Sequence, residues 1–406
     1  MTKSINSRIA SIVLAIICSA FLISNYVKSI FGITADFGDY LLLLCLLILF
    51  VLQINKKLHP SKYVLTMVCL IPFLIGLIAL MRNDQNIPLS DGYYKYFFFY
   101  VIISYLVTKN EINNELFLRW MMIIIVPIIL VGSSFWAETS EARIGGSSIG
   151  MGASYSLLPC VIAFILHFSY YRKKTVVYYS LYVLNALCCV RLVLSGTRGC
   201  LLGIVLTVYY VIIDKNKHEA SFKKVALGYG VLLSMFWIVL SNLQSVLKLI
   251  YDFLNEHGLY NNLIFKSYNA LLRNSSILNG RDYLWDEAKR IISSESMGTG
   301  VGCFENTYGT YPHNIVFQFL LDFGWVIGGL MCFLLLYCFF KGITCSFDNK
   351  VLVVMFFFCS IPRLMVSSTY WKDQFFWLFL IYSTYIIWNS RRRKTVEVKN
   401  CANSCY

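Results

Sequence analysis

The chain has 406 residues, of which 58% are hydrophobic and only 14% are charged. Soluble domains carry about 25% charged and roughly 45–50% apolar residues, and a single core of this chain length cannot hide the excess. The composition therefore excludes a soluble globular protein and a small disulfide scaffold. It also excludes nucleic-acid binding as the reason for the net charge of +14. The chain is predicted to be an all-α polytopic membrane protein.

Twelve apolar segments follow one another along the chain. Backbone N–H and C=O groups in lipid must be satisfied within the segment, so each one is predicted to be a helix. The predicted helices are 9–27, 40–53, 63–81, 95–108, 119–136, 151–171, 175–194, 198–213, 225–243, 313–341, 351–366 and 374–388.

The distribution of Lys and Arg predicts the orientation, because these residues mark cytoplasmic loops. With a cytoplasmic N-terminus, the inside segments hold 21 of the 35 basic residues and the short outside loops hold five. We therefore expect both termini in the cytoplasm. The chain then divides into helices one to nine (1–243), an outside loop or cap (244–312), helices ten to twelve (313–390) and a basic cytoplasmic tail (391–406).

The long outside loop predicts two amphipathic helices and a glycine-rich turn. Apolar residues at helical spacing run from Val246 to Leu254 and again from Leu284 to Ile292. A glycine-rich turn between Met297 and Cys303 follows the second of them. Loops of this length without a function are uncommon, so the loop is expected to fold as a small cap on the outer membrane surface.

Four arginines gather near the outer ends of the predicted helices. Always-charged side chains are costly in a membrane and are functional candidates by default. An alternative for each one is that it snorkels to a lipid headgroup. As a group they suit an anionic ligand, because the planar guanidinium matches phosphate oxygens. A lipid carrying a pyrophosphate would supply that anion. The four are Arg143, Arg191, Arg198 and Arg363.

His313 is the histidine best placed for chemistry. It stands in the run Tyr311, Pro312, His313, Asn314, where the proline is expected to set His313 in the first turn of the tenth helix. An imidazole facing the outer aqueous layer can act as a general base on a hydroxyl at neutral pH. The cysteines lie mostly inside apolar runs without a CxxC pair, so they predict packing and no metal site.

Four short motifs occur in a fixed order between about residues 141 and 329. They are Glu-Ala-Arg-Ile-Gly-Gly at 141–146 with Gly-Ala-Ser-Tyr-Ser at 152–156; Ser-Gly-Thr-Arg-Gly at 195–199; Gly280 and Arg281 with Leu284, Trp285, Gly298, Gly300, Gly302 and Phe304; and His313 and Asn314 with Gly324 and Gly328. In order and spacing they resemble the O-antigen ligase/polymerase family of bacterial envelope polysaccharide enzymes. The sequence departs from the family in the fourth motif, where Ile327 replaces a small or polar residue.

The resemblance implies a fold, a substrate and site residues. The fold would be a C-type glycosyltransferase architecture in the bacterial inner membrane, acting on undecaprenyl-pyrophosphate-linked glycans at the periplasmic face. Arg191, Arg198 and Arg281 would engage the pyrophosphate, and His313 would be the catalytic base, with Tyr311 and Asn314 beside it. No metal and no other cofactor is expected.

The activity expected from these residues is an inverting transfer of a glycan chain. A polymerase, which joins lipid-linked repeat units, is favoured over a ligase, which transfers the glycan to lipid A core. A flippase or other transporter and a membrane acyltransferase using His167 are the alternatives from other classes. The expected partners are the lipid-linked oligosaccharide, membrane lipids, a chain-length regulator and a flippase, with no nucleic acid.

Overall fold

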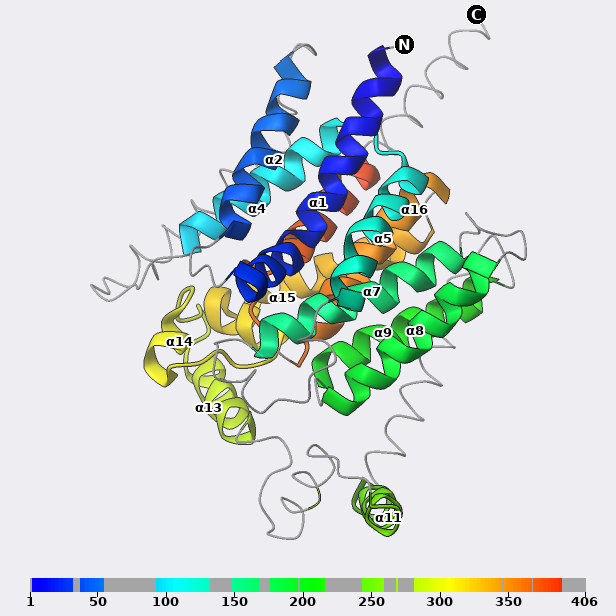
Figure 1. The fold of residues 1–406 in the computed structure, drawn as a ribbon. Helices are drawn as coiled ribbons and strands as arrows, with labels where there is room; N and C mark the ends of the chain where they lie inside the picture. The colour runs from blue at the N-terminus through cyan, green and yellow to red at the C-terminus, as the bar shows by residue number, and fades with distance from the viewer. Residues whose placement is uncertain are drawn as a thin grey trace, which may run out of the picture.

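The structure, a computed structural model, describes residues 2–31, 37–54, 93–131, 148–167, 176–195, 198–215, 243–258, 268, 281–344, 347–366 and 368–388. Within these ranges every regular element is a helix (Figure 1). They are α1 (Thr2–Phe31), α2 (Phe37–Ile54), α4 (Tyr93–Lys109), α5 (Asn114–Val131), α7 (Ser148–His167), α8 (Val176–Ser195), α9 (Arg198–Lys215), α11 (Leu243–Glu256), α13 (Arg281–Ser294), α14 (Cys303–Tyr308), α15 (Ile315–Ile343), α16 (Phe347–Leu364), η2 (Tyr370–Lys372) and an unlabelled helix, Gln374–Trp388.

The predicted helix positions agree with the described helices to within about seven residues. Ten of the twelve predicted segments coincide with a described helix, and both amphipathic helices of the long loop are present as α11 and α13. The segment 63–81 and nearly all of 225–243 lie outside the described residues. Two of the described helices, Ile5–Ser24 and Ile315–Ile343, are long and apolar enough to cross a membrane. The chain is thus consistent with a helical membrane protein, and the number of spans stays a prediction.

Large apolar side chains lie exposed along several helices. On α2 they include Leu44 and Val51, on α8 Val176 and Val183, and on α15 Val326, which is 74% exposed. A soluble monomer rarely exposes apolar surface of this extent. Rows of exposed aliphatic side chains are expected when the surrounding solvent is a bilayer.

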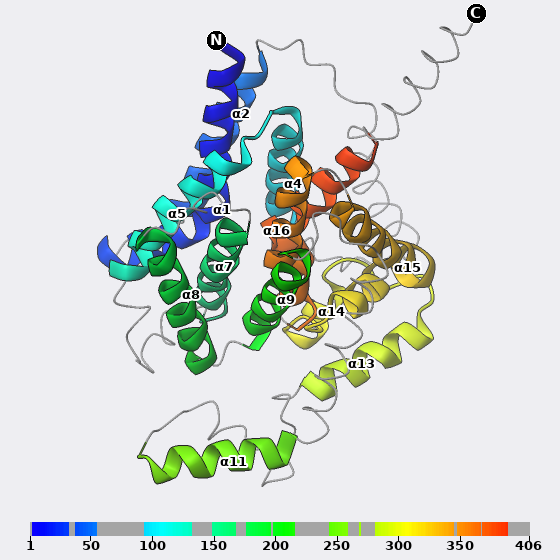
Figure 2. The same cartoon turned by 90° about the vertical axis from the view of Figure 1, so that its right-hand side faces the viewer.

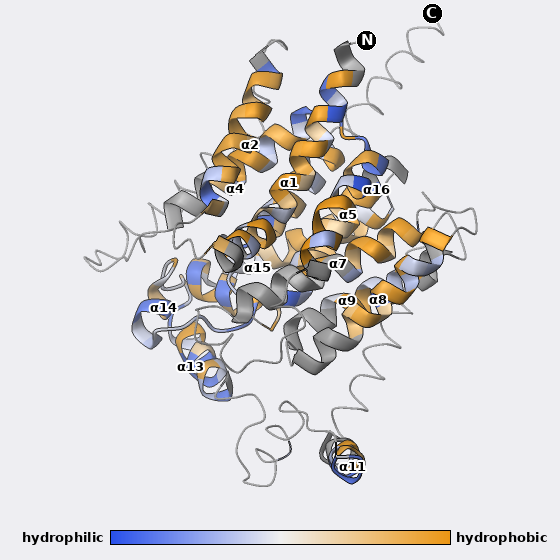
Figure 3. Cartoon of the chain, viewed as in Figure 1, coloured by the Kyte–Doolittle hydropathy of each residue, from blue (hydrophilic) through white to orange (hydrophobic). Residues whose placement is uncertain are grey.

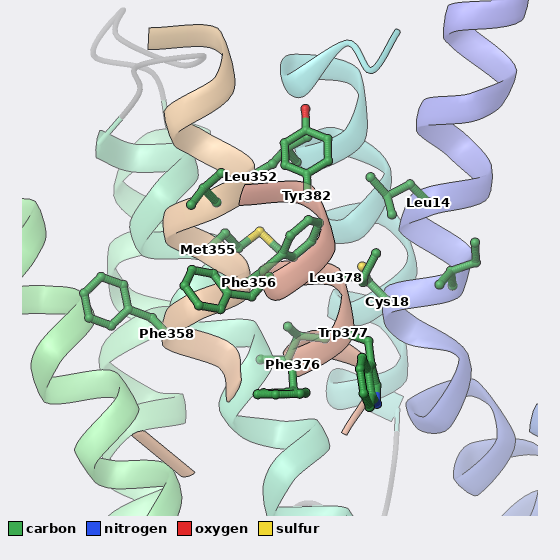
Figure 4. Close-up of a cluster of buried hydrophobic side chains, with 14 of the residues drawn as sticks. Leu14, Cys18, Leu352, Met355, Phe356, Phe358, Phe376, Trp377, Leu378 and Tyr382 are labelled. Carbon is green, nitrogen blue, oxygen red and sulfur yellow. The ribbon is translucent and has the colours of Figure 1, made fainter. Parts of the chain in front are cut away.

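The hydrophobic core lies where α1, α16 and the helix Gln374–Trp388 meet (Figure 4). Aromatic rings fill much of it, and the ring centroids of Phe376 and Trp377 lie 5.1 Å apart. In a membrane such contacts hold helices together by van der Waals packing. The labelled members of this cluster are Leu14, Cys18, Leu352, Met355, Phe356, Phe358, Phe376, Trp377, Leu378 and Tyr382.

Small residues let α7, α9 and α16 approach closely. A Cβ on Gly203 of α9 would lie 3.0 Å from the carbonyl oxygen of Phe358 on α16. One turn later, the Thr207 hydroxyl donates to the Gly203 carbonyl at 2.7 Å and lies 3.4 Å from Cys160 Sγ on α7. Interfaces of small residues with local hydrogen bonds are typical of packed membrane helices.

The polar elements gather at one end of the bundle. The N-terminal end of α1 lies at one end, and α11, α13 and α14 lie at the other (Figures 1 and 2). The end of α8 at Ser195, the start of α9 at Arg198 and the end of α16 at Leu364 lie at the lower end of the bundle in Figure 2, which is the end nearer α13. Hydrophilic residues are frequent on α13 and α14, whereas the coloured residues of the bundle helices are mostly hydrophobic (Figure 3).

Candidate functional site

The helix that follows His313 is broken. Gly324, inside α15, has φ 76° and ψ −176°, and these backbone angles are incompatible with a helix. The sequence predicted one continuous helix over 313–341, so that prediction is wrong at Gly324. After the break the chain folds back closely, because a Cβ on Gly328 would lie 2.5 Å from the Phe319 carbonyl oxygen. Both glycines of the fourth motif are therefore needed to bring the two halves of α15 together.

The glycine-rich turn supplies the backbone partners that the broken helix lacks. Trp325 N–H donates to the Ser296 carbonyl at 2.9 Å, and Thr299 N–H donates to the Leu321 carbonyl at 2.5 Å. The turn comes this close only at a residue without a side chain, since a Cβ on Gly298 would lie 2.9 Å from the Leu321 oxygen. The break thus has its hydrogen bonds satisfied by a segment about 25 residues away.

The turn and its neighbouring helices have a small hydrophobic core of their own. Ala288 and Ile292 of α13, Phe304 of α14 and Leu321 of α15 are buried together. The Trp325 indole also donates to the Ile292 carbonyl at 3.0 Å. α13, the glycine turn, α14 and the first half of α15 therefore form one packed unit, called here the cap unit (281–324).

His313 lies at the edge of the cap unit, just before α15. The helix begins at Ile315, and Asn314 caps it by accepting from Val316 N at 2.9 Å and Phe317 N at 3.3 Å. The prediction that His313 lies in the first helical turn is therefore wrong by two residues. Asn314 is the better N-cap because its side-chain oxygen satisfies free N–H groups. His313 instead has φ 54°, a left-handed backbone that a residue with a Cβ adopts at a cost of about 1–3 kcal/mol.

Two contacts hold the His313 turn in place. The Trp285 indole of α13 donates to the Pro312 carbonyl at 2.9 Å. The Tyr311 and His313 rings lie 4.3 Å apart, centroid to centroid. A strained backbone persists only where its surroundings fix it, and such residues cluster at active sites. Tyr311 and Asn314, both predicted as supporting residues, are thus brought to His313.

A buried polar network lies behind this turn and was not predicted. Gln318 Nε2 donates to Glu305 Oε1 at 2.9 Å, and the Tyr370 hydroxyl donates to Asp322 Oδ2 at 2.9 Å. Burial raises the pKa of the Glu305 carboxyl from its ordinary value of 4.5. These bonds join α14 and α15 to the turn that contains η2.

Arg363 belongs to the same region. Its guanidinium pairs with Asp373, whose side chain is fully buried, while 18% of the Arg363 side chain is exposed. Asp373 also accepts from the Phe376 N–H at 3.0 Å at the start of the last described helix. Arg363 is therefore held beside the turn of residues 368–373.

The other predicted arginines are placed only by their backbone. Arg191 lies in the last turns of α8, Arg198 is the first residue of α9, and Arg281 is the first residue of α13. All three of these helix ends lie at the end of the bundle that carries the cap unit (Figure 2). Their side chains and the whole of Arg143 lie outside the described residues.

One signal in the sequence would have found part of the unpredicted network. Asp322 stands inside an apolar segment, and an ionisable residue there is a candidate for function or for a buried contact. Glu305, Gln318 and Tyr370 carry no such signal, because their pairing depends on how α14 and η2 dock against α15.

The described geometry offers a histidine on a fixed turn, with arginine-bearing helix ends on the same side of the bundle. An imidazole can take a proton from a hydroxyl, and arginines can stabilise negative charge on a leaving group. Among the described residues, no group of three His, Cys, Asp or Glu side chains could hold a metal ion.

A known protein family matches the part of the chain that contains the candidate site. Residues 183–334, a little over a third of the sequence, match the family model described as O-antigen ligase. No curated protein and no solved structure matches the chain. The matched stretch begins in α8 and ends in α15, so it contains Arg191, Arg198, Arg281 and His313.

Proposed function

We propose that the protein is a polysaccharide polymerase of the inner membrane, because residues 183–334 match the family model described as O-antigen ligase. It joins undecaprenyl-pyrophosphate-linked glycan repeat units at the periplasmic face, with both termini in the cytoplasm. The family match supports glycosyl transfer on lipid-linked glycans and does not separate polymerase from ligase.

The observation that carries the proposal is the conformation of His313. The residue has a left-handed backbone at φ 54°, held by Asn314, which caps the next helix, and by the Trp285 bond to Pro312. His313 deprotonates a hydroxyl of the acceptor sugar. That oxygen then bonds to the anomeric carbon of the donor, and the bond from this carbon to the pyrophosphate oxygen breaks with inversion. General-base help of this kind contributes roughly 10²- to 10⁴-fold in rate.

The leaving pyrophosphate is held by arginines. Arg191, Arg198 and Arg281 lie at helix ends on the side of the cap unit. Arg143 and Arg363 complete the predicted set, and Arg363 shares its charge with Asp373. Fixed cations stabilise the charge that develops on the leaving group, so the reaction needs no metal in this proposal.

Ligation to lipid A core is the second candidate, because it uses the same donor and the same base. A flippase or transporter is less favoured, since no internal repeat relates the two halves of the sequence. An acyltransferase would depend on His167, which instead lies beside the Tyr210 ring at 6.3 Å in the helix bundle.

The test replaces His313 by Asn in a strain whose chromosomal copy has been deleted. Asn tolerates a left-handed backbone, so the His313→Asn protein keeps its fold and loses only the imidazole. We expect repeat-unit transfer in membrane vesicles to fall about 10²- to 10⁴-fold at an unchanged protein level. The matched control is His257→Asn, which alters an exposed histidine after α11 and should transfer at the wild-type rate.

The lipopolysaccharide gel of the deletion strain separates the candidates. Lipid A core carrying one repeat unit supports the polymerase. Core without a repeat unit, with polymer left on the lipid carrier, indicates the ligase. Full transfer by His313→Asn would contradict the role of His313, and an unchanged ladder in the deletion strain would direct the search to capsule or exopolysaccharide.

A further inference from the structure

α13 has a second, partly exposed face next to its apolar one, and a hydrogen bond from Tyr308 ties this face to α14. The apolar side of α13 packs against α14 and α15, and Tyr283, Glu287 and Arg290 follow one another at helical spacing on the adjacent side. Tyr283 is 60% exposed, and the Arg290 side chain is 66% exposed. Tyr308, at the end of α14, lies beside them.

These four side chains form a connected network. Arg290 donates through Nε and Nη2 to Glu287 Oε2 at 2.9 and 2.6 Å, and the Tyr308 hydroxyl donates to the same oxygen at 2.8 Å. The hydrogen bonds from Arg290 and Tyr308 lower the pKa of Glu287 and keep it ionised. The planar guanidinium and carboxylate are therefore fixed before any ligand arrives, which reduces the entropy lost on binding.

An aromatic ring stands next to this network. The Tyr283 and Tyr308 rings meet edge to face with centroids 6.3 Å apart, and Phe304 lies 4.6 Å behind Tyr308. A rigid tyrosine offers a broad apolar face that is ordered at low entropic cost. A pyranose has an apolar face of C–H groups and a rim of hydroxyls. The Tyr283 ring can stack on the apolar face of the sugar. Arg290 can donate hydrogen bonds to the sugar hydroxyls, and Glu287 can accept hydrogen bonds from them.

A neighbouring ion pair shows what a plain solvated pair on the same helix looks like. Lys289 contacts Asp286 at 3.0 Å, and 59% and 74% of these two side chains are exposed. The Glu287 side chain is only 22% exposed and accepts from two different residues. The network around Glu287 is thus more ordered than an exposed pair requires.

The network lies close to the proposed base along the chain. His313 follows Tyr308 by five positions, which limits the distance between their Cα atoms to about 17 Å. An oligosaccharide that reacts at His313 therefore has other sugars within reach of this face of α13.

We propose that Tyr283, Glu287, Arg290 and Tyr308 form a binding subsite for the oligosaccharide of the acceptor, beside the residue that deprotonates it. The inference rests on the proposed function, because it assigns this subsite to a substrate of the same reaction. Its ligand is a neutral or acidic oligosaccharide, with one pyranose on the Tyr283 ring and its hydroxyls bonded to Arg290 and Glu287.

The experiment measures oligosaccharide binding to the full-length protein in lipid nanodiscs. The probe is the repeat-unit oligosaccharide released from the surface polysaccharide of the same strain, followed by saturation-transfer NMR. We expect Tyr283→Ala and Arg290→Ala to weaken Kd at least tenfold, and Tyr283→Phe, which keeps the ring, to bind nearly as well as wild type. In transfer assays the two alanine variants should raise KM for the acceptor with little change in kcat.

Two controls keep the test independent of folding and of the reaction. Lys289→Ala removes the neighbouring ion pair and should bind as wild type does. His313→Asn should also bind as wild type while losing transfer. Wild-type Kd values in both alanine variants, equal weakening by Lys289→Ala, or no binding by wild type would each overturn the subsite. If Tyr283→Ala and Arg290→Ala changed the chain-length distribution of the polymer but left oligosaccharide binding unchanged, the subsite would also be overturned. This face of α13 would then be assigned to a protein partner.

The two proposals fail in different ways. If His313→Asn keeps full transfer while Tyr283→Ala and Arg290→Ala still lose oligosaccharide binding, the base assignment fails and the subsite stands. If His313→Asn loses transfer and the α13 variants bind and react normally, the proposed function stands and the subsite fails.

Discussion

Replacing Gly324 by Ala should open the contact between the two halves of α15 and the glycine turn. The backbone at φ 76°, ψ −176° is open almost only to glycine, so a side chain there costs about 1–3 kcal/mol. The added Cβ would also lie 2.5 Å from Met297 C. Relief requires the turn to move away, which breaks the Trp325–Ser296 and Thr299–Leu321 backbone bonds at about 1 kcal/mol each. The total loss is about 3–5 kcal/mol of local stability.

Hydrogen exchange followed by mass spectrometry reports this loss directly. Because 1.4 kcal/mol corresponds to a tenfold change, protection of the amides of Thr299 and Trp325 should fall roughly 10²- to 4 × 10³-fold. Gly329→Ala is the matched control, since a Cβ there meets nothing within 4 Å, and its protection should not change. Gly300 has φ 92° and open space around it, so Gly300→Ala introduces backbone strain without a steric clash. Its loss of protection should lie between those of Gly329→Ala and Gly324→Ala. If the amides of Gly324→Ala were as protected from exchange as those of wild type, the close contact between the glycine turn and α15 would be refuted.

Two further predictions concern the polar groups behind His313. Asp373→Ala removes the buried carboxylate that accepts from Arg363 and should lower stability by about 3 kcal/mol, the low end for a buried pair because Arg363 is partly exposed. Glu115→Ala, which breaks an exposed pair with Arg119, should change thermal denaturation in detergent by no more than about 1 kcal/mol. For Glu305, burial raises the folded-state pKa above 4.5, so the folded protein holds the proton more tightly than the unfolded chain. Wild type should therefore lose stability relative to Glu305→Gln as pH rises above about 4.5 through that folded-state pKa, and parallel melting curves at every pH would contradict it.

The helices could be predicted because each is encoded by its own local pattern. α11 and α13 follow from apolar residues at helical spacing, and α2 and α8 from continuous apolar runs. The break in α15 could not be predicted in this way. The residues around Gly324 are apolar on both sides, and the cause of the break lies in the turn at Ser296–Thr299, which the local pattern does not see.

The sequence singled out the residues of the His313 turn but not the way in which that turn is built. His313, Tyr311 and Asn314 were identified from one short run, but Pro312 does not set His313 in the first helical turn, because Asn314 caps a helix that begins at Ile315. The Glu305 and Tyr370 contacts were missed because they join parts of the chain that are far apart. Side-chain pairing of this kind is set by tertiary packing and leaves no local period in the sequence.

Under the proposed function, the break in α15 also lets one helix combine a membrane span with a position for His313 in the cap unit. From Trp325 to Ile343 the second half has nineteen residues, or about 28 Å, which matches a hydrocarbon thickness of about 30 Å. The strongly exposed apolar side chains of α15, beginning with Trp325 and Val326, all follow the break. The half before Gly324 is therefore not needed to span lipid. It is free to pack in the cap unit, with Asp322 paired to Tyr370 and His313 at its outer end. In a continuous helix, the nine residues before Gly324 would instead extend about 13 Å straight on from the second half, and His313 would lie at the far end of that extension.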